Sequence, residues 1–425
     1  DVVFEQQDSK PDRMRSSVGA QDLKSGSPLI VACAIGVACS AIALPFYATG
    51  VVTKPIVEEF GWQRGDVQFA IMFSSGLGAL TAPVTGWMIS RWSARAVALP
   101  SLIGLSIGFV ITANASSLAT FYLGYAFMAL LGAGTNPVTW TQAITRSFEK
   151  KRGAALGLAL VGTGLSALLV PIYVTWLEQQ YGWRGAFYGL ALLPLLIALP
   201  ITIAWFRPTA ELISDQAKQM AVRTGVTLSD AIKDYRFWIL AASILSVYLA
   251  VSGILTNLVP AITDMGISQE NAALITGSLG ISLIFGRIIA GILMDRFWAP
   301  GVAAIILMTP VASCLIFWIG APVPLLLLAA LLLGLAAGAE LDILAFLTAR
   351  YFGLAHYAKI YAWLYAALAI GSASAPTLFA TIYDMNGTYA PGFAIGCGLF
   401  AFGALSLLFL GPYPKFELLE RLARS

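Results

Sequence analysis

Three ionisable residues, Arg287, Glu340 and Asp342, interrupt stretches of sequence that are otherwise apolar and long enough to cross a membrane. A charged side chain at the centre of a bilayer costs roughly 2.5–3.5 kcal/mol or more, so residues of this kind usually line a substrate or ion pathway. Arg287 precedes Asp295, the expected end of its span, by eight residues, or about 12 Å of helix, which is too deep for its head group to snorkel to water. We therefore expect these residues to carry the chemistry of the protein.

The guanidinium of Arg287 is suited to bind a carboxylate. It presents a planar fork of N–H donors that matches two carboxylate oxygens, and it stays charged at any physiological pH. We predict that Arg287 binds an anionic substrate. The alternative is a permanent ion pair with Glu340 or Asp342 that only holds helices together.

The two carboxyl groups could couple transport to protons. Glu340 and Asp342 are two residues apart, which is about 200° around a helix, so only one of them can face a central cavity. Burial favours the protonated form of a carboxyl group and a nearby Arg favours the ionised form, so a carboxyl beside Arg287 can gain or lose a proton as substrate arrives. Either acid could instead tie neighbouring helices together.

Polar and aromatic residues elsewhere could shape the same site. Tyr47 lies near the centre of the first apolar stretch. Three further pairs are spaced four residues apart, so that each pair shares one face of a helix: Asn136 and Trp140, Tyr248 and Ser252, Tyr361 and Tyr365. An aromatic lining would suit a carboxylate with an apolar or aromatic body. The alternative for each residue is packing, or the aromatic belt that Trp and Tyr form at membrane surfaces.

The elements that must position these residues are transmembrane helices. Hydrophobic residues make up 58% of the chain and charged residues only 11%, and the apolar stretches are continuous rather than alternating, which excludes a β-barrel. The uncharged stretches 96–145 and 297–339 are 50 and 43 residues long, so each holds two helices. The sequence therefore predicts an all-α membrane protein with about twelve transmembrane helices.

The positive charges predict how these helices are oriented. When alternate loops are assigned to opposite sides, 21 Lys and Arg residues fall on one side and three on the other, with Arg287 between them. This asymmetry predicts that both termini are cytoplasmic, in a plasma membrane or a bacterial inner membrane. The net charge of +3 is mostly this loop bias, so no nucleic-acid partner is expected. No nucleotide-binding loop, metal-ligand spacing or nucleophile–base pair is present, which predicts neither a cofactor nor an enzyme.

The chain divides into two similar halves. A shift of about 205 residues superimposes Pro55 on Pro260 and Gly61 on Gly266, so the sequence predicts two pseudo-symmetric six-helix bundles. The predicted parts are a cytoplasmic tail (1–28), the N-terminal bundle (29–206), a cytoplasmic linker (207–235), the C-terminal bundle (236–411) and a second tail (412–425).

The same register places neutral residues opposite the three charges. The pairs are Ala82 with Arg287, Asn136 with Glu340, and Val138 with Asp342. Charge in one half only, at positions where the halves meet, is typical of a transporter with a single central site. Because Asn136 is also polar, we prefer Glu340 over Asp342 as the acid that faces this site.

A loop motif resembles the major facilitator superfamily. Residues 86–95 read GWMISRWSAR and residues 291–296 read GILMDR, which is similar to the G-x-x-x-D-R-x-x-x-R loop of that family, with Ser90 and Pro300 as departures. The resemblance implies that Asp295 acts as a conformational latch against the start of the fifth helix, and that Arg91 and Arg95 belong to the equivalent latch of the first half. The alternative for Arg91 and Arg95 is simple anchoring by the positive-inside rule.

Three further segments are similar to the monocarboxylate transporter and oxalate:formate antiporter groups: TKPIVEEFGW (53–62), YGWR (181–184) and GRIIAG (286–291). In those groups an Arg at the position of Arg287 receives the substrate carboxylate. The chain departs from animal monocarboxylate transporters at two positions, with Tyr47 in place of a Lys and Leu283 in place of an Asp. If protons are coupled here, Glu340 or Asp342 must replace that pair.

The sequence therefore predicts a secondary transporter that moves a small organic anion, most simply a monocarboxylate, by alternating access with proton symport. Its partners would be the small carboxylate, protons and the lipid bilayer, and the pattern is compatible with a monomer. Two alternatives stay open. One is carboxylate exchange without proton coupling, and the other is a membrane sensor that uses a transporter fold.

Overall fold

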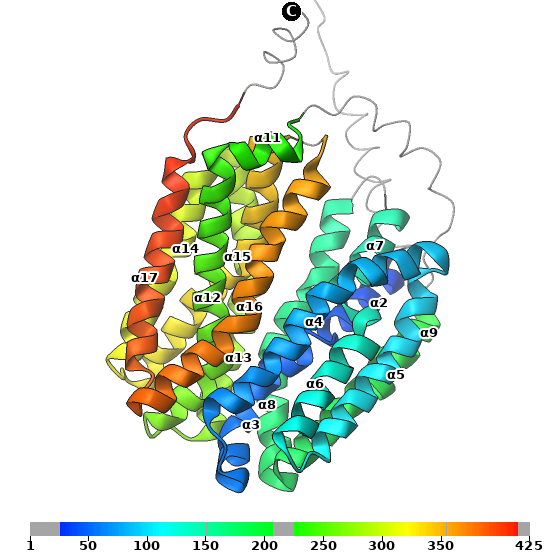
Figure 1. Ribbon diagram of the computed structural model, residues 1–425, viewed down its shortest axis with the longest axis vertical. Helices are drawn as coiled ribbons and strands as arrows, with labels where there is room; N and C mark the ends of the chain where they lie inside the picture. The colour runs from blue at the N-terminus through cyan, green and yellow to red at the C-terminus, as the bar shows by residue number, and fades with distance from the viewer. Residues whose placement is uncertain (1–25, 149–151, 207–224, 354, 415–425) are drawn as a thin grey trace, which may run out of the picture.

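The computed structural model describes residues 26–148, 152–206, 225–353 and 355–414, and these residues form helices and no β-strand. Figure 1 shows two bundles side by side, one blue to green and the other green to red. An isolated bridge between Gly225 and Gly353 ties the segment before the second bundle to the end of α15 (Val323–Phe352).

The N-terminal bundle crosses the expected membrane six times. Two passages are each made of two helices, two are single helices, and one long helix takes part in the last two. Its elements are α2 (Ser27–Ala38), α3 (Ala43–Phe60), α4 (Arg64–Arg91), α5 (Ala94–Ala113), α6 (Leu118–Leu131), η1 (Ala133–Thr135), α7 (Pro137–Ser147), α8 (Arg152–Leu192), η2 (Leu193–Ala198) and α9 (Leu199–Trp205). Helices α2 and α3 form one passage, and so do α6 and α7. Helix α8 turns at Gly182, whose φ of 69° is readily adopted only without a Cβ.

The C-terminal bundle adds six passages, each made of one main helix. They are α12 (Tyr235–Asp264), α13 (Gln269–Arg296), α14 (Ala299–Trp318), α15, α16 (Tyr357–Asn386) and α17 (Ala390–Ser406), which η4 (Leu407–Leu410) extends. A short helix, α11 (Leu228–Lys233), precedes them. The predicted all-α fold with twelve passages is confirmed. Helix α12 begins one residue before the predicted domain boundary.

Helix breaks in the N-terminal bundle distinguish the two halves. The chain leaves helical geometry between α2 and α3, bends by 46° between residues 78 and 83 of α4, and breaks between α6 and α7. At the last break, Pro137 begins α7 and holds Asn136 in an extended conformation (ψ 154°), because the residue before a proline is disfavoured in helical geometry. A sharp new helix start is therefore present at residue 137.

Three helix pairs make the main contacts between the bundles: α3 with α12, α4 with α16, and α8 with α13. Glycines permit this approach. A Cβ on Gly50 would collide with the carbonyl oxygen of Thr256, and one on Gly280 would collide with that of Gly164. Small residues at helix contacts are the usual means by which membrane helices pack closely.

Candidate functional site

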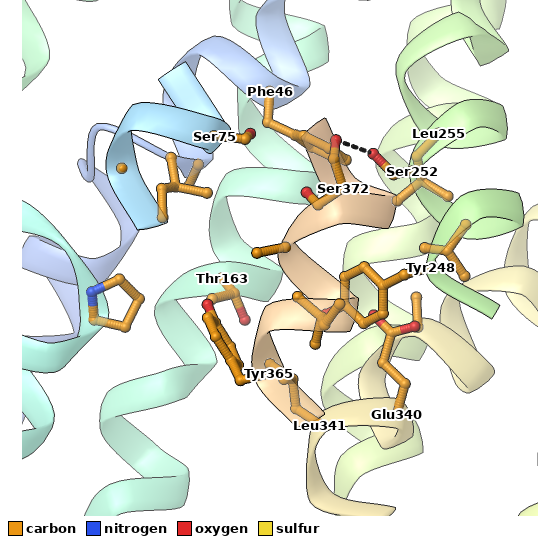
Figure 2. A pocket seen from close by; sticks show the side chains of 18 of the residues that line it. Phe46, Ser75, Thr163, Tyr248, Ser252, Leu255, Glu340, Leu341, Tyr365 and Ser372 are labelled. Atoms are coloured by element: carbon orange, nitrogen blue, oxygen red, sulfur yellow. Dashed lines mark hydrogen bonds between the residues drawn. The ribbon is translucent and has the colours of Figure 1, made fainter. Parts of the chain in front are cut away.

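A cavity of about 250 Å³ lies between the two bundles. Its lining is mostly apolar with a few polar groups, which is typical of a small-molecule site. The lining residues come from α3, α4, α7 and α8 of the first bundle and from α12, α13, α15 and α16 of the second (Figure 2). Seven of the residues predicted from the sequence line it: Tyr47, Asn136, Tyr248, Ser252, Arg287, Glu340 and Tyr365.

The guanidinium of Arg287 is bound at Nε and unpaired at Nη1. Its Nε is 3.2 Å from Oδ2 of Asp342 and 3.5 Å from the carbonyl oxygen of Gly338. This arrangement depends on the close contact of α13 with α15, where a Cβ on Gly338 would collide with the Leu283 carbonyl. Nη1 of Arg287 is buried and has no hydrogen-bond partner. The guanidinium therefore keeps an unpaired donor group beside the cavity.

The two acids occupy different environments, as their spacing around α15 requires. Glu340 lines the cavity with 4% of its surface exposed, and its Oε2 has no hydrogen-bond partner. Tyr248 lies beside its carboxylate (Figure 2). Asp342 is outside the cavity lining and forms the ion pair with Arg287. One acid is thus available to the cavity and the other is engaged with the cation.

The tyrosines of α16 form a stack that leads to the cavity. Tyr365 lines the cavity, and its ring centroid is 6.2 Å from that of Tyr361, which is 5.4 Å from that of Tyr357. Tyr361 is outside the cavity lining. On α12, the hydroxyl of Ser252 donates to the carbonyl of Ser372 at 3.0 Å, which links α12 to α16 (Figure 2).

Trp140 lies outside the cavity lining. It is fully buried, its Nε1 donates to the Thr135 carbonyl at 2.7 Å, and its ring packs against Phe206 with centroids 4.9 Å apart. These contacts correspond to the packing alternative. The break before Pro137 explains the difference from Asn136, because Asn136 is the extended cap of α7 and does not share its helical face.

Asn136 and Ser75 are buried residues that each have an unpaired side-chain oxygen. Both line the cavity, and neither Oδ1 of Asn136 nor Oγ of Ser75 has a hydrogen-bond partner. Leaving such a group unsatisfied costs about 1–3 kcal/mol. Sequence reasoning missed Ser75, because a lone Ser in an apolar helix usually bonds to the preceding turn and gives no distinctive pattern.

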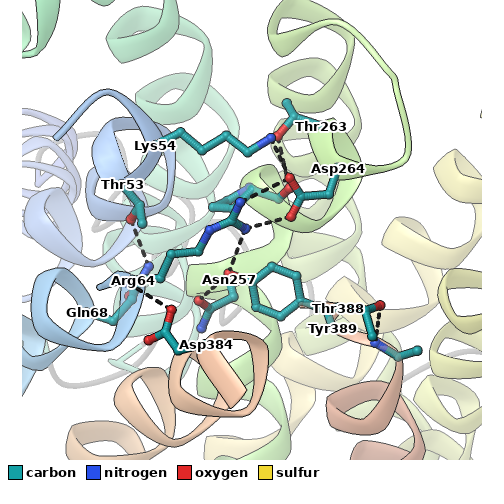
Figure 3. A network of polar contacts seen from close by, with 12 residues as sticks. Thr53, Lys54, Arg64, Gln68, Asn257, Thr263, Asp264, Asp384, Thr388 and Tyr389 are labelled. Atoms are coloured by element: carbon teal, nitrogen blue, oxygen red, sulfur yellow. Dashed lines mark hydrogen bonds and ion pairs between the residues drawn. The ribbon is translucent and has the colours of Figure 1, made fainter. Parts of the chain in front are cut away.

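An ion-pair network closes the end of the molecule that carries Lys54 (Figure 3). Nζ of Lys54 lies 2.6 Å from Oδ1 of Asp264, and the guanidinium of Arg64 binds the same carboxylate at 2.6 and 3.1 Å. The backbone amides of Arg64 and Gly65 donate to Asp384 at 3.1 and 2.7 Å. Both cations belong to the N-terminal bundle and both acids to the C-terminal bundle, so the network joins the two. We call it the Lys54-end gate.

Further contacts reinforce this gate. The guanidinium carbon of Arg64 lies 3.6 Å from the ring centroid of Tyr383, and Nε2 of Gln68 donates to the Thr256 carbonyl at 3.1 Å. Sequence reasoning counted Lys54 and Arg64 only as loop charges. It could not find the gate because the pattern does not reveal which helix ends meet across the bundles.

The opposite end, which carries Arg91, is different. Within the described ranges, no ion pair joins the two bundles there. Arg91 and Asp295 are exposed, and Nη2 of Arg95 donates to the Ile203 carbonyl at 2.7 Å. The predicted latch between Asp295 and the start of the fifth helix adjoins residues 149–151, outside the described residues, and stays a prediction.

Comparison with known proteins finds relatives that are all named as transporters. The chain is 24% identical over 383 residues to monocarboxylate transporter 11 of Homo sapiens, an alignment that covers 85% of this chain and 78% of the relative. It is 28% identical over 258 residues to monocarboxylate transporter 4 of Gallus gallus, covering 59% and 54%. The uncharacterized MFS-type transporter YhjX of Escherichia coli (strain K12) is 24% identical over 310 residues, covering 71% and 75%.

A solved structure with a similar fold is that of a bacterial homolog to the human lysosomal transporter Spinster, in an inward-facing and occupied conformation. It covers 90% of this chain and 94% of its own, with a TM-score of 0.63 and 18% identity. The family model described as Major Facilitator Superfamily matches residues 31–319. Since that match spans more than half of the sequence and the fold agrees with it, the chain belongs to the major facilitator superfamily and is a transporter rather than an enzyme.

Proposed function

We propose that this transporter carries a small monocarboxylate by alternating access and couples its movement to protons. The observation that carries the proposal is the guanidinium of Arg287, which lies on the wall of the central cavity with a buried, unpaired Nη1. An unpaired cationic donor in a mostly apolar cavity favours an anionic ligand. The relatives named monocarboxylate transporters support the same substrate class.

The carboxylate would bind the free edge of Arg287 while Asp342 holds the other edge. Nε is already engaged by Asp342, so the ion pair orients the fork and leaves Nη1 for the substrate. The apolar wall formed by Phe46, Leu255 and Leu368 would contact the body of the substrate. A small organic acid with an apolar body matches both features.

Glu340 is the proposed proton carrier. It is buried at the cavity wall, and one of its carboxylate oxygens has no hydrogen-bond partner. Burial disfavours its ionised form, whereas the positive charge of Arg287 favours it. When a substrate carboxylate neutralises Arg287, this support weakens, and Glu340 would take up a proton together with the substrate.

Alternating access would proceed by rocking of the two bundles around this cavity. The Lys54-end gate joins the bundles at one end, and within the described residues the Arg91 end has no comparable ion pair. We infer that the structure represents the state open toward the Arg91 end. The excess of Lys and Arg on that side supports its placement in the cytoplasm.

A second candidate is carboxylate exchange without protons. Two cavity-lining residues, Tyr47 and Leu283, favour this candidate. They stand where animal monocarboxylate transporters have a Lys and an Asp, so the ammonium and carboxyl groups of that pair are absent at these two positions.

Purified protein in proteoliposomes separates the two candidates. Uptake of labelled butyrate should depend on an imposed inward proton gradient and stop when an ionophore collapses it. Exchange would instead persist without the gradient, provided that counter-substrate is inside. Binding without any flux would contradict both and favour a sensor.

A further inference from the structure

The cavity has a second polar region, on the side of the N-terminal bundle. Arg287 and Glu340 belong to the C-terminal bundle, whereas Asn136 and Ser75 belong to the N-terminal bundle, and all four line the same cavity. Figure 2 shows Ser75 and Glu340 entering this space from separate helices at different heights. A ligand held by Arg287 therefore has further polar groups available away from its carboxylate.

Asn136 has the position of a helix cap but does not act as one. Asn at the N-cap normally folds back to accept a hydrogen bond from the first turn of its helix. At the start of α7 the side chain of Asn136 forms no such bond. Only 4% of the residue is exposed, and its Oδ1 has no hydrogen-bond partner. The side chain lines the cavity instead.

Two helix N-termini adjoin this region. Ile42 and Ala43 at the start of α3, and Asn136 and Pro137 at the start of α7, all line the cavity. Such ends carry partial positive charge, which favours an oxygen-bearing group and disfavours an ammonium group. The buried, unpaired Oγ of Ser75 adds a group that can donate or accept.

We propose that Asn136 and Ser75 form a subsite for a hydroxyl group at the end of the substrate remote from its carboxylate. A hydroxyl can both donate and accept, so it can pair with Oδ1 of Asn136 as a donor or with Oγ of Ser75 as an acceptor. This inference rests on the proposed function and narrows it from monocarboxylates in general to acids with a distal hydroxyl group. Asn136 is then a specificity residue and Arg287 binds the carboxylate.

Binding to the purified wild-type transporter by calorimetry tests the subsite. The probes are butyrate, pentanoate and hexanoate, each compared with its 4-, 5- or 6-hydroxy derivative, and 2-hydroxyhexanoate, whose hydroxyl lies next to the carboxylate. We expect one terminal hydroxyl derivative to bind about tenfold more tightly than its parent acid. The 2-hydroxy acid should show no such gain.

Variants then locate the effect. Asn136→Leu should abolish the preference for the terminal hydroxyl, while butyrate, pentanoate and hexanoate still bind. If the larger Leu side chain prevents folding, Asn136→Ala replaces it in the same measurement. Thr163→Val is the matched control, because Thr163 lines the same cavity but its hydroxyl already donates to the Leu160 carbonyl at 2.8 Å. The preference should persist in this control.

The outcomes distinguish the two levels of the proposal. Equal binding of all parent and hydroxy acids, or a preference unchanged in the Asn136 variants, would overturn the subsite while leaving the monocarboxylate proposal intact. Failure of every carboxylate to bind the folded wild-type protein would overturn both.

Discussion

At the scale of single residues, the shape of the Arg287 side chain matters as much as its charge. Nε is bound to Asp342, so a substrate depends on the remaining donors of the fork. We expect Arg287→Lys to pair with Asp342 as a point cation and to lose most transport, by about a factor of ten or more in kcat/KM, because an ammonium cannot bind both partners in this geometry. Initial rates of butyrate uptake in proteoliposomes measure this.

A matched variant controls for folding. Arg350→Lys changes an exposed Arg in the last turn of α15, and it should transport normally. If Arg287→Lys is folded by size-exclusion chromatography and transports as fast as Arg350→Lys, carboxylate capture by the fork is excluded.

Glu340 provides the second prediction at this scale. Glu340→Gln keeps the size of the side chain, but its amide cannot carry a proton. We expect the variant to lose accumulation driven by a pH gradient while it still exchanges labelled for unlabelled butyrate. Asp342→Asn is the comparison, because Asp342 is outside the cavity lining. Persistent pH-driven accumulation in Glu340→Gln, together with its loss in Asp342→Asn while exchange of labelled butyrate continues, would assign the proton to Asp342.

The sequence pattern identified the charged residues well and their surroundings less well. Arg287 and Glu340 stood out because ionisable groups are costly in an apolar span. Ser75 has no such rarity, and the environment of Trp140 depends on a break in the chain rather than on spacing. Residue type therefore predicts which groups carry chemistry, but neighbouring backbone geometry determines which of them reach the cavity.

At the scale of elements, the Lys54-end gate depends on one carboxylate shared by two cations. Asp264 binds Lys54 and Arg64 together, and the Arg64 side chain is only 9% exposed. We expect Asp264→Asn to favour the state open at this end by about 1–2 kcal/mol, because hydrogen bonds to charged groups contribute on this order. The rate at which a maleimide modifies a cysteine at Val259, a buried residue that lines the same small pocket as Lys54, would rise accordingly.

The control for the gate is Glu270→Gln, since Glu270 is an exposed acid in the first turn of α13 near the same end. It should leave the modification rate unchanged. A rate in Asp264→Asn equal to that in this control would mean that helix packing alone keeps the end closed.

The sequence predicts the number of membrane passages but not where a passage is broken into two helices. Uncharged length identifies a membrane passage because a bilayer sets its minimum span, and it correctly assigned two passages to each of the long stretches 96–145 and 297–339. Length says nothing of the interruption between α6 and α7. Pro137 marks that position in retrospect, but proline is tolerated within other helices here, as at Pro260 of α12. Tertiary contacts decide which prolines break a helix.

At the scale of the whole molecule, the internal repeat predicts reciprocal motion of the two ends. Trp92 and Phe297 are exposed equivalents at the Arg91 end, and Gln63 and Ser268 are exposed equivalents at the Lys54 end, each pair separated by the same 205 positions. If the bundles rock about the cavity, closing one end must open the other. A single displacement should therefore change the two pairs in opposite directions.

Spin labels at cysteines in these positions test this with pulsed distance measurements in nanodiscs. When butyrate is added at acid pH, the fraction of molecules with a shorter 92–297 distance should increase. The fraction with a longer 63–268 distance should increase by the same amount. A label pair within one bundle, at Gln63 and Ser116, should not change, because each bundle moves as a rigid body. Changes of the same sign at both ends would exclude rocking. They would indicate that the cavity opens by separation of the bundles, or by local movement at the bend in α4 or at the break between α6 and α7.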